Sequence, residues 1–362
     1  MTMKSILLGS AAAIAATSSV QAADAIIAAE PEPTEYVRVC DAFGTGFFYI
    51  PGTETCLRIG GYVRFQTNFG PRESAGRWEG KQSTSDWDAF ARAQLILEAK
   101  NDTEYGALTS YIAIQADTDN DAHNNFKLDE AYIQLAGLRA GHFASWWDKG
   151  LNGETDISGN DTTVFNSISY TYDAGAFQAG IAIDELEGLT SKNNGVGVEG
   201  IVSVSLGGAS FDLLGGYDTE VKQGAIRGLV SADLGPGVLQ GFAVWSSDPN
   251  SYWSTSKWSV AASYRLNVTD RLAITPGAQY FGDLRRNVLF NAAWRGAASP
   301  NESFGNGNAW KVGVTADYKI TEGLDVRTTV NYVKVDYNDT FKGSKSKNDD
   351  YVSGFVRLQR SF

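Results

Sequence analysis

The sequence has few of the residues on which catalytic and metal sites usually depend. It contains two histidines, His123 and His142, and two cysteines, and no GxSxG motif occurs. A hydrolase needs a nucleophile, a base and an orienting group within mutual reach. Because His142 precedes Ser145, the spacing alone leaves a triad open. A hydrolase is therefore kept as an alternative, while no enzyme chemistry, cofactor or metal is expected.

Long apolar runs are missing too. Beyond the N-terminal segment no stretch approaches about 18 apolar residues, which excludes a helical membrane span. The mean hydropathy of −0.22 is typical of a soluble protein. A barrel with a wet lumen would give the same value, because each strand presents only half of its side chains to lipid. With 8 prolines, 39 glycines and 12% aromatic residues, the composition favours many strands and tight turns.

Basic residues are outnumbered by acidic ones. The formal net charge is −12, and loss of Lys4 with a signal segment would leave −13. An acidic chain is not expected to bind nucleic acid, and it favours cations over anions near its surface.

The N-terminus has the pattern of a secretory signal peptide. Lys4 supplies the positive charge, residues 6–16 form the apolar region, and Val20-Gln21-Ala22 has the small-residue form of a cleavage site. We predict cleavage between Ala22 and Ala23. The domain plan is a signal peptide (1–22), a lead-in with the cysteine pair (23–56) and a transmembrane barrel (57–362).

Both cysteines lie near the start of the mature chain. An even number of cysteines in an exported protein suggests a disulfide between Cys40 and Cys56. Closing this loop of about 15 residues would stabilise the segment by about 3 kcal/mol in the chain-entropy model. Two separate thiols are the alternative.

Apolar and polar residues alternate along many segments. In 177–184, for example, Phe177, Ile181 and Ile183 share one face, and Gln178 and Asp184 share the other. This period of two predicts half-buried strands. The predicted strands are 57–67, 88–100, 105–116, 126–135, 138–143, 163–172, 177–184, 196–206, 210–217, 224–234, 238–246, 257–266, 271–281, 308–320, 324–336 and 350–362.

The connections between these strands alternate between short and long. The short ones are Asn101–Glu104, Ala136–Gly137, Asp173–Ala176, Gly207–Ala209, Gly235–Gly237, Asn267–Asp270 and Thr321–Gly323. An alternation that places all short connections at one end of the strands and all long ones at the other is typical of an outer-membrane barrel, which has short periplasmic turns and longer outer loops. The fold class predicted is all-β, a transmembrane up-and-down antiparallel barrel of about 16 strands.

Three segments resemble a known family. Residues 36–59, which contain both cysteines, are similar to the N-terminal signature of alphaproteobacterial porins. Residues 129–142 resemble the strand–turn–strand before the third external loop of trimeric general porins, and the ending 357–362 also fits. The resemblance implies a sixteen-stranded homotrimer with one pore per subunit.

A charge gradient across the pore is the main candidate site. In the porin family the third loop folds inward, which would place residues 144–162 in the lumen. This loop carries acidic residues, and arginines on the polar faces of the strands would lie opposite it. Opposed charges in a pore set a transverse field that filters ions. The predicted constriction consists of Arg58, Arg64, Arg92, Arg139, Asp148, Glu154, Asp156 and Asp161.

Two further patterns are weak. Residues 195–200 match GxGxxG but open a strand without a surrounding βαβ unit, so a dinucleotide site is not expected. Asp117, Asp119 and Asp121 resemble the start of a calcium loop, but Ala122 and Leu128 replace the required Gly and Glu. A looser cation site there, bridging lipopolysaccharide phosphates, stays open, with a solvated loop as the alternative.

Together these features predict a multi-pass protein of the bacterial outer membrane. Its expected function is that of a general diffusion porin for small hydrophilic solutes and ions, weakly cation-selective, with outer-membrane lipid and lipopolysaccharide as partners. A substrate-specific channel, an outer-membrane hydrolase and an adhesin or structural barrel are the alternatives.

Overall fold

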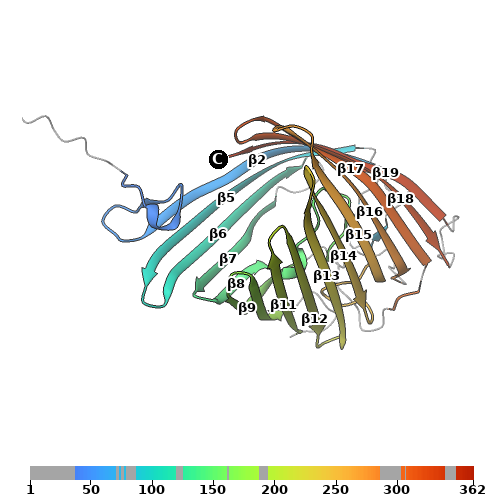
Figure 1. The fold of residues 1–362 in the computed structure, drawn as a ribbon, viewed down its shortest axis with the longest axis horizontal. Coiled ribbons are helices and arrows are strands. Elements are labelled where there is room, and N and C mark those ends of the chain that lie inside the picture. Colours follow the sequence, from blue (N-terminus) through green and yellow to red (C-terminus); the bar gives the residue numbers. More distant parts are fainter. Residues whose placement is uncertain are drawn as a thin grey trace, which may run out of the picture. The chain divides into compact units, whose positions relative to one another are not determined.

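Sixteen antiparallel strands close into one barrel within the described residues (Figure 1). The computed structural model describes residues 37–70, 73–74, 77–78, 87–119, 125–160, 163–186, 195–285, 303–305, 307–338 and 348–362. The barrel strands are β2 (Cys56–Phe69), β5 (Trp87–Thr103), β6 (Gly106–Asp119), β7 (Asn125–Leu135), β8 (Leu138–Ala144), β9 (Val164–Asp173), β10 (Phe177–Glu185), β11 (Val196–Leu206), β12 (Ala209–Asp218), β13 (Gln223–Leu234), β14 (Gly237–Ser246), β15 (Ser256–Asn267), β16 (Leu272–Leu284), β17 (Gly307–Thr321), β18 (Leu324–Tyr337) and β19 (Asn348–Ser361).

The barrel closes between its first and last strands. Each strand pairs with its neighbours in sequence, and β19 pairs with β2 from Gly354↔Phe69 to Ser361↔Tyr62. Closure pairs the backbone groups that an open sheet edge would expose to lipid. Short elements flank β2: β1 (Phe48–Tyr49) pairs with its start, and a small hairpin of β3 (Glu73–Ser74) and β4 (Arg77–Trp78) follows it.

The predicted strands are confirmed, with small differences at their ends. The predicted turn at Asn101–Glu104 is wrong, because β5 and β6 continue to pair as far as Thr103↔Gly106. A hairpin can extend its ladder beyond the apolar band of the membrane, where alternation of polar and apolar residues no longer marks a strand.

None of the described helices is long and apolar enough to cross a membrane.

The two faces of the strands differ in the way the alternation predicts. Ile181 and Ile183 of β10 are 58% and 59% exposed, whereas Asp184, the next residue on the opposite face of the same strand, is 1% exposed. Apolar side chains therefore cover the outside of the barrel and polar ones face its interior, the reverse of a water-soluble barrel.

The largest buried apolar cluster lies inside the barrel. Trp147 and Leu151, from the connection between β8 and β9, pack with Tyr252 and Trp253, from the connection between β14 and β15. Inward side chains of the wall, including Phe281, complete the cluster. Two long connections thus fold into the lumen and fill part of it.

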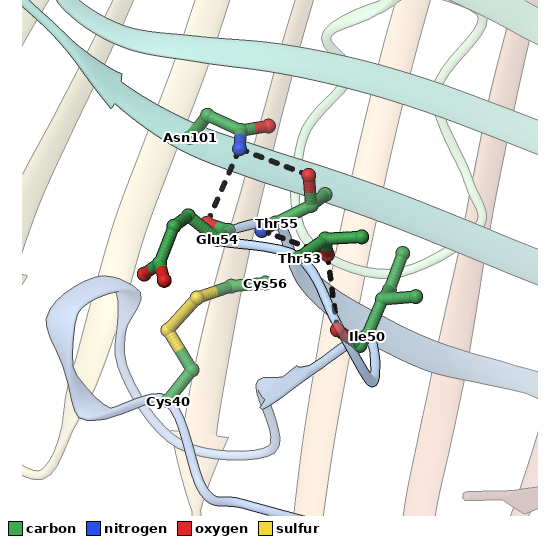
Figure 2. The surroundings of a disulfide bond; sticks show 7 residues. All are labelled: Cys40, Ile50, Thr53, Glu54, Thr55, Cys56 and Asn101. Atoms are coloured by element: carbon green, nitrogen blue, oxygen red, sulfur yellow. Dashed lines mark hydrogen bonds between the residues drawn. A yellow bond between two sulfur atoms is a disulfide. The ribbon is translucent and has the colours of Figure 1, made fainter.

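The predicted disulfide between Cys40 and Cys56 is present (Figure 2). Both cysteines are buried with Phe47 in a small cluster of their own. Asn101 near the end of β5 donates hydrogen bonds to Thr55 Oγ1 (2.9 Å) and to the carbonyl of Glu54 (3.2 Å). The disulfide segment is therefore held against the short-turn end of the barrel.

Candidate functional site: a loop inside the barrel

Residues 145–160 and Thr163, which we call the inner loop, run along the inside of the barrel wall. The short 3₁₀ helix η2 (Trp146–Asp148) begins the loop, with Ser145 Oγ accepting a hydrogen bond from Trp147 N. The loop then contacts inward polar side chains of β12, β14, β16 and β17. These contacts are Lys149 Nζ to Asp212 (2.6 Å), Asn152 N to Gln240 (2.6 Å), Ile157 N to Gln279 (2.6 Å) and Glu154 N to Thr315 Oγ1 (2.9 Å).

Arg227 of β13 anchors the start and the end of the inner loop. Its side chain is fully buried and donates to the carbonyls of Trp146 and Trp147, both at 3.2 Å, and to that of Ser158. Its guanidinium also lies over the ring of Trp147, 5.2 Å from the centroid. One cation thereby satisfies three carbonyls of an irregular segment that has no strand partner.

Residues 247–255, the second inner loop, pack behind the first. Asn160 of the inner loop donates to the carbonyl of Asn250 (2.8 Å) and accepts from Ser254 Oγ (2.9 Å). Tyr252 donates from its hydroxyl to Asp184 (2.7 Å) and contacts Trp147, with ring centroids 5.9 Å apart. Burial and the adjacent carboxylate raise the pKa of Tyr252, so this hydroxyl stays a donor. No pattern in the sequence predicted that this second loop would fold into the barrel.

At its tip the inner loop places Glu154 in a cluster of arginines. Glu154 Oε1 lies 2.6 Å from Arg327 Nη1 of β18 and 3.4 Å from Arg357 Nη1 of β19. Arg327 also pairs with Asp317 of β17 (2.5 Å), which in turn pairs with Arg265 of β15 (2.5 Å). We call these five residues the arginine cluster. Their side chains are 15% to 37% exposed, so the cluster borders water.

Two predicted arginines continue this charged wall. Arg64 of β2 donates to Gln359 of β19 (2.9 Å) and lies within electrostatic range of Glu154 and Arg92. Arg92 of β5 makes a two-point contact with Asp117 of β6 at 2.6 and 2.8 Å. Among the described residues no carboxylate forms an ion pair with Arg64. The structure thus brings Glu154, Arg64 and Arg92 into one region.

The other two predicted arginines lie elsewhere. Arg58 pairs with Glu98 and lies over the ring of Phe47, 5.0 Å from its centroid, beside the disulfide segment. Arg139 of β8 donates to Gln134 (2.9 Å) and lies over the rings of Tyr132 and Phe143. Within the part of the chain that the structure describes, neither forms an ion pair or a hydrogen bond with Glu154.

The remaining acidic candidates serve the loop itself or are not described. Asp148 accepts from Thr163 Oγ1 (2.5 Å), which joins the two ends of the loop. Asp156 accepts from Leu151 N (3.1 Å), and burial raises the pKa of its carboxyl. Asp161 lies outside the described residues, as does Asp121 of the acidic segment 117–121.

Sequence reasoning missed the arginines that meet Glu154. Arg327 and Arg357 lie on the inward faces of their strands. The residues next to them in sequence point outward: Val326 and Thr328 beside Arg327, and Val356 and Leu358 beside Arg357. That parity was available as a signal. It could not show which part of the wall the loop would touch, because the path of the loop depends on anchors such as Arg227.

Comparison with known proteins agrees with this architecture. Residues 24–355 match the family model described as "Porin subfamily". The chain belongs to the alphaproteobacterial porin family.

The relatives of this porin span its whole length. It is 57% identical to the outer membrane protein y4fJ of Sinorhizobium fredii, over 100% of this chain and 99% of that protein. It is 45% identical to outer membrane protein IIIA of Rhizobium leguminosarum, over 92% and 90% of the two chains. It is 34% identical to porin Omp2b of Brucella neotomae, over the full length of both.

Solved structures share the fold at low identity. The outer membrane channel DcaP of Acinetobacter baumannii superposes with a TM-score of 0.61 at 15% identity, covering 87% of this porin and 99% of DcaP. The anion-selective porin of Comamonas acidovorans gives 0.57 at 14% identity, covering 85% and 100%.

These findings establish a channel of the outer membrane, not an enzyme. The ring nitrogen Nδ1 of His142 lies 2.9 Å from Asn166 Oδ1. Ser145, the nearest candidate nucleophile in sequence, accepts from Trp147 N.

Proposed function

We propose that this protein is a general diffusion porin, which lets small hydrophilic solutes and ions cross the outer membrane passively. The observation that carries the proposal is the inner loop, held inside a closed barrel by contacts from β12 to β19. A sixteen-stranded barrel is wide enough for an aqueous channel, and a loop fixed across part of it narrows the passage.

The constriction in this proposal lies between Glu154 and the wall that carries Arg64 and Arg92. Rows of opposed charge set a transverse field that orients polar solutes and filters ions. The arginine cluster supports this position, because it fixes the acidic tip of the loop beside basic side chains that reach water. Asp148 and Asp156 act in this proposal by shaping the loop.

We also propose that ion selectivity is weak and favours cations. Arg64 and Arg92 together with the arginine cluster hold five arginines, against Asp117, Asp317 and Glu154. This local excess favours anions at the passage itself. The chain as a whole has a net charge of −12, so the acidic excess lies outside this region, and in this proposal it attracts cations toward the channel. The two contributions oppose each other.

A homotrimer is proposed from the family, together with contact to outer-membrane lipid and lipopolysaccharide and removal of residues 1–22. Small outward residues on the early strands would let neighbouring barrel walls approach closely. These residues are Ala89, Ala91, Ala93, Ala131 and Ala140. A heat-dissociable trimer in mild detergent is expected, and a monodisperse monomer in several mild detergents would contradict it.

Single-channel recording tests the function. Purified protein in a planar bilayer should give ohmic current steps, and a salt gradient should give a small reversal potential of the cation-selective sign. An anion-selective sign would show that the arginines dominate, and absence of current steps from a folded trimer would contradict the porin function itself.

A further inference from the structure

A polar cavity lies inside the barrel, away from the arginine cluster. Its volume is about 310 Å³, at the lower end of the range for small-molecule sites. The lining comes from the β7–β8 turn (Ala136 and Gly137), from β9 down to Asp173, and from the start of the inner loop at Ser145 and Trp146. The cavity therefore lies between the inner loop and the short-turn end, which is the periplasmic end of such a barrel.

Arg139 is the cationic group of this cavity. Its Nε donates to Gln134, and the guanidinium lies over the rings of Tyr132 and Phe143 at 4.7 and 5.2 Å from their centroids. None of the ion pairs among the described residues includes Arg139. The aromatic rings fix the plane of the guanidinium, while its two terminal nitrogens remain able to donate to a carboxylate in the two-point geometry that arginine favours.

Two acidic residues line the same cavity. Both oxygens of Asp173 already accept hydrogen bonds, from Gly175 N and from Gln178, which leaves Glu199 of β11. Its side chain is 2% exposed, and within the described structure its Oε2 has no hydrogen-bond partner. A buried polar atom without a partner is uncommon and calls for a ligand or water. The carboxyl of Glu199 also accepts hydrogen bonds from the Trp146 N–H and the Ser145 hydroxyl, and Asp184 lies within electrostatic range of it. A cationic group entering here would favour the ionised form of this carboxyl.

The cavity is therefore lined both by the guanidinium of Arg139, which has no ion-pair partner among the described residues, and by Glu199, which has one carboxyl oxygen without a hydrogen-bond partner. Ser169, Thr171 and Trp146 complete this part of the lining. We propose that it binds small zwitterionic carboxylates of the amino-acid type, with the carboxylate on Arg139 and the ammonium group toward Glu199. This inference rests on the proposed porin function and adds a preferred solute class to it. A solute that has passed the inner loop would be held here before release to the periplasm.

The test is block of the ionic current by added solutes. Planar bilayers containing the full-length protein receive L-alanine, propionate or propylammonium on the periplasmic side. Propionate lacks the ammonium group and propylammonium lacks the carboxylate. L-Alanine is expected to cause brief current blockades at concentrations about tenfold lower than either of the other two, because only the zwitterion uses both ends of the cavity.

Two variants assign the two ends. Arg139→Gln should raise the half-blocking concentration of both L-alanine and propionate about tenfold. Arg139→Lys should raise both concentrations by less, because its single ammonium group still attracts the carboxylate but replaces the two-point contact of the guanidinium. Glu199→Gln should weaken block by L-alanine and leave block by propionate unchanged. Arg271→Gln and Glu322→Gln are the matched controls, since both side chains are exposed in turns at the same end of the barrel.

The outcomes separate this proposal from the porin function. Normal conductance with equal block by L-alanine and propionate, or with a block that neither Arg139→Gln nor Glu199→Gln changes, would overturn the binding site and leave the porin intact. A protein that folds and does not conduct would overturn the porin function instead. Heat-shifted mobility of each variant on electrophoresis establishes that it has folded.

Discussion

Neutralising Glu154 is the sharpest perturbation of the proposed constriction. Glu154→Gln keeps the size of the side chain and removes one negative charge 2.6 Å from Arg327 and 3.4 Å from Arg357. The backbone anchors of the same residue remain, because its N–H donates to Thr315 and its carbonyl accepts from Asn331. The loop should therefore stay in place while the field changes.

The size of the effect follows from Coulomb's law. For an ion passing about 8 Å from the carboxylate in water, the interaction is about 0.5 kcal/mol. A cation and an anion differ by twice this, about 1 kcal/mol, which screening at 0.1 M salt reduces to about half. The permeability ratio of cation to anion should then fall about twofold. The two ion pairs are partly exposed, and losing them should cost about 0.2 to 1 kcal/mol each in stability.

The assay is the reversal potential in a tenfold salt gradient, measured beside single-channel conductance. Glu322→Gln removes the same charge from an exposed turn and serves as the control. A permeability ratio that does not differ between the two variants would refute the position of Glu154 in the passage. A large change in conductance would instead show that the loop has moved.

Four further predictions follow from other parts of the structure. Arg64→Gln should shift the reversal potential in the opposite sense to Glu154→Gln, because it removes a guanidinium without a carboxylate partner among the described residues. Arg227→Met should raise conductance and current noise, since one buried and two partly buried carbonyls of the inner loop lose their donor, at up to about 1 to 3 kcal/mol each. Reduction of Cys40–Cys56 should expose the segment before β2 to proteases by removing about 3 kcal/mol of loop constraint, with little change in the thermal dissociation of the barrel. The raised pKa of Asp156 means that the folded loop binds its proton more tightly than the unfolded chain, so the loop's stability should fall as pH rises through that pKa, and Asp156→Asn should flatten this dependence in hydrogen-exchange measurements of the loop.

Each of these has an outcome that contradicts it. A reversal potential of Arg64→Gln equal to that of the unmodified protein would show that this arginine does not line the passage. Unchanged conductance in Arg227→Met would show that the remaining contacts hold the loop. Equal protease resistance before and after reduction would make the disulfide dispensable, and an unchanged pH dependence in Asp156→Asn would assign the titration to another group.

The local pattern of the sequence determined the barrel. Alternation such as Phe177, Ile181 and Ile183 against Gln178 and Asp184 gives a strand with one lipid face and one wet face, whatever the rest of the chain does. Strand positions, the closing pair of strands and the disulfide could therefore be predicted. Strand ends were less certain, as at Thr103, because pairing outside the bilayer needs no alternation.

The site could be predicted only in part. Parity along a strand gives the face of Arg64 or Arg92, so both were placed on the lumen side. It gives no distance between residues that are far apart in the chain, and so it could not pair Glu154 with Arg327 or Arg357.

The tertiary structure decided where the inner loop lies. Its path depends on Arg227, on the polar groups of β12 to β19 and on the second inner loop behind it, all far from it in sequence. The same folding brings Arg139 and Glu199 to one cavity and buries Asp156 within the loop. A strand's face is fixed by its own residues, because the pleat repeats every two positions, whereas the meeting of two charged groups across a lumen is fixed only when the whole barrel has closed around them.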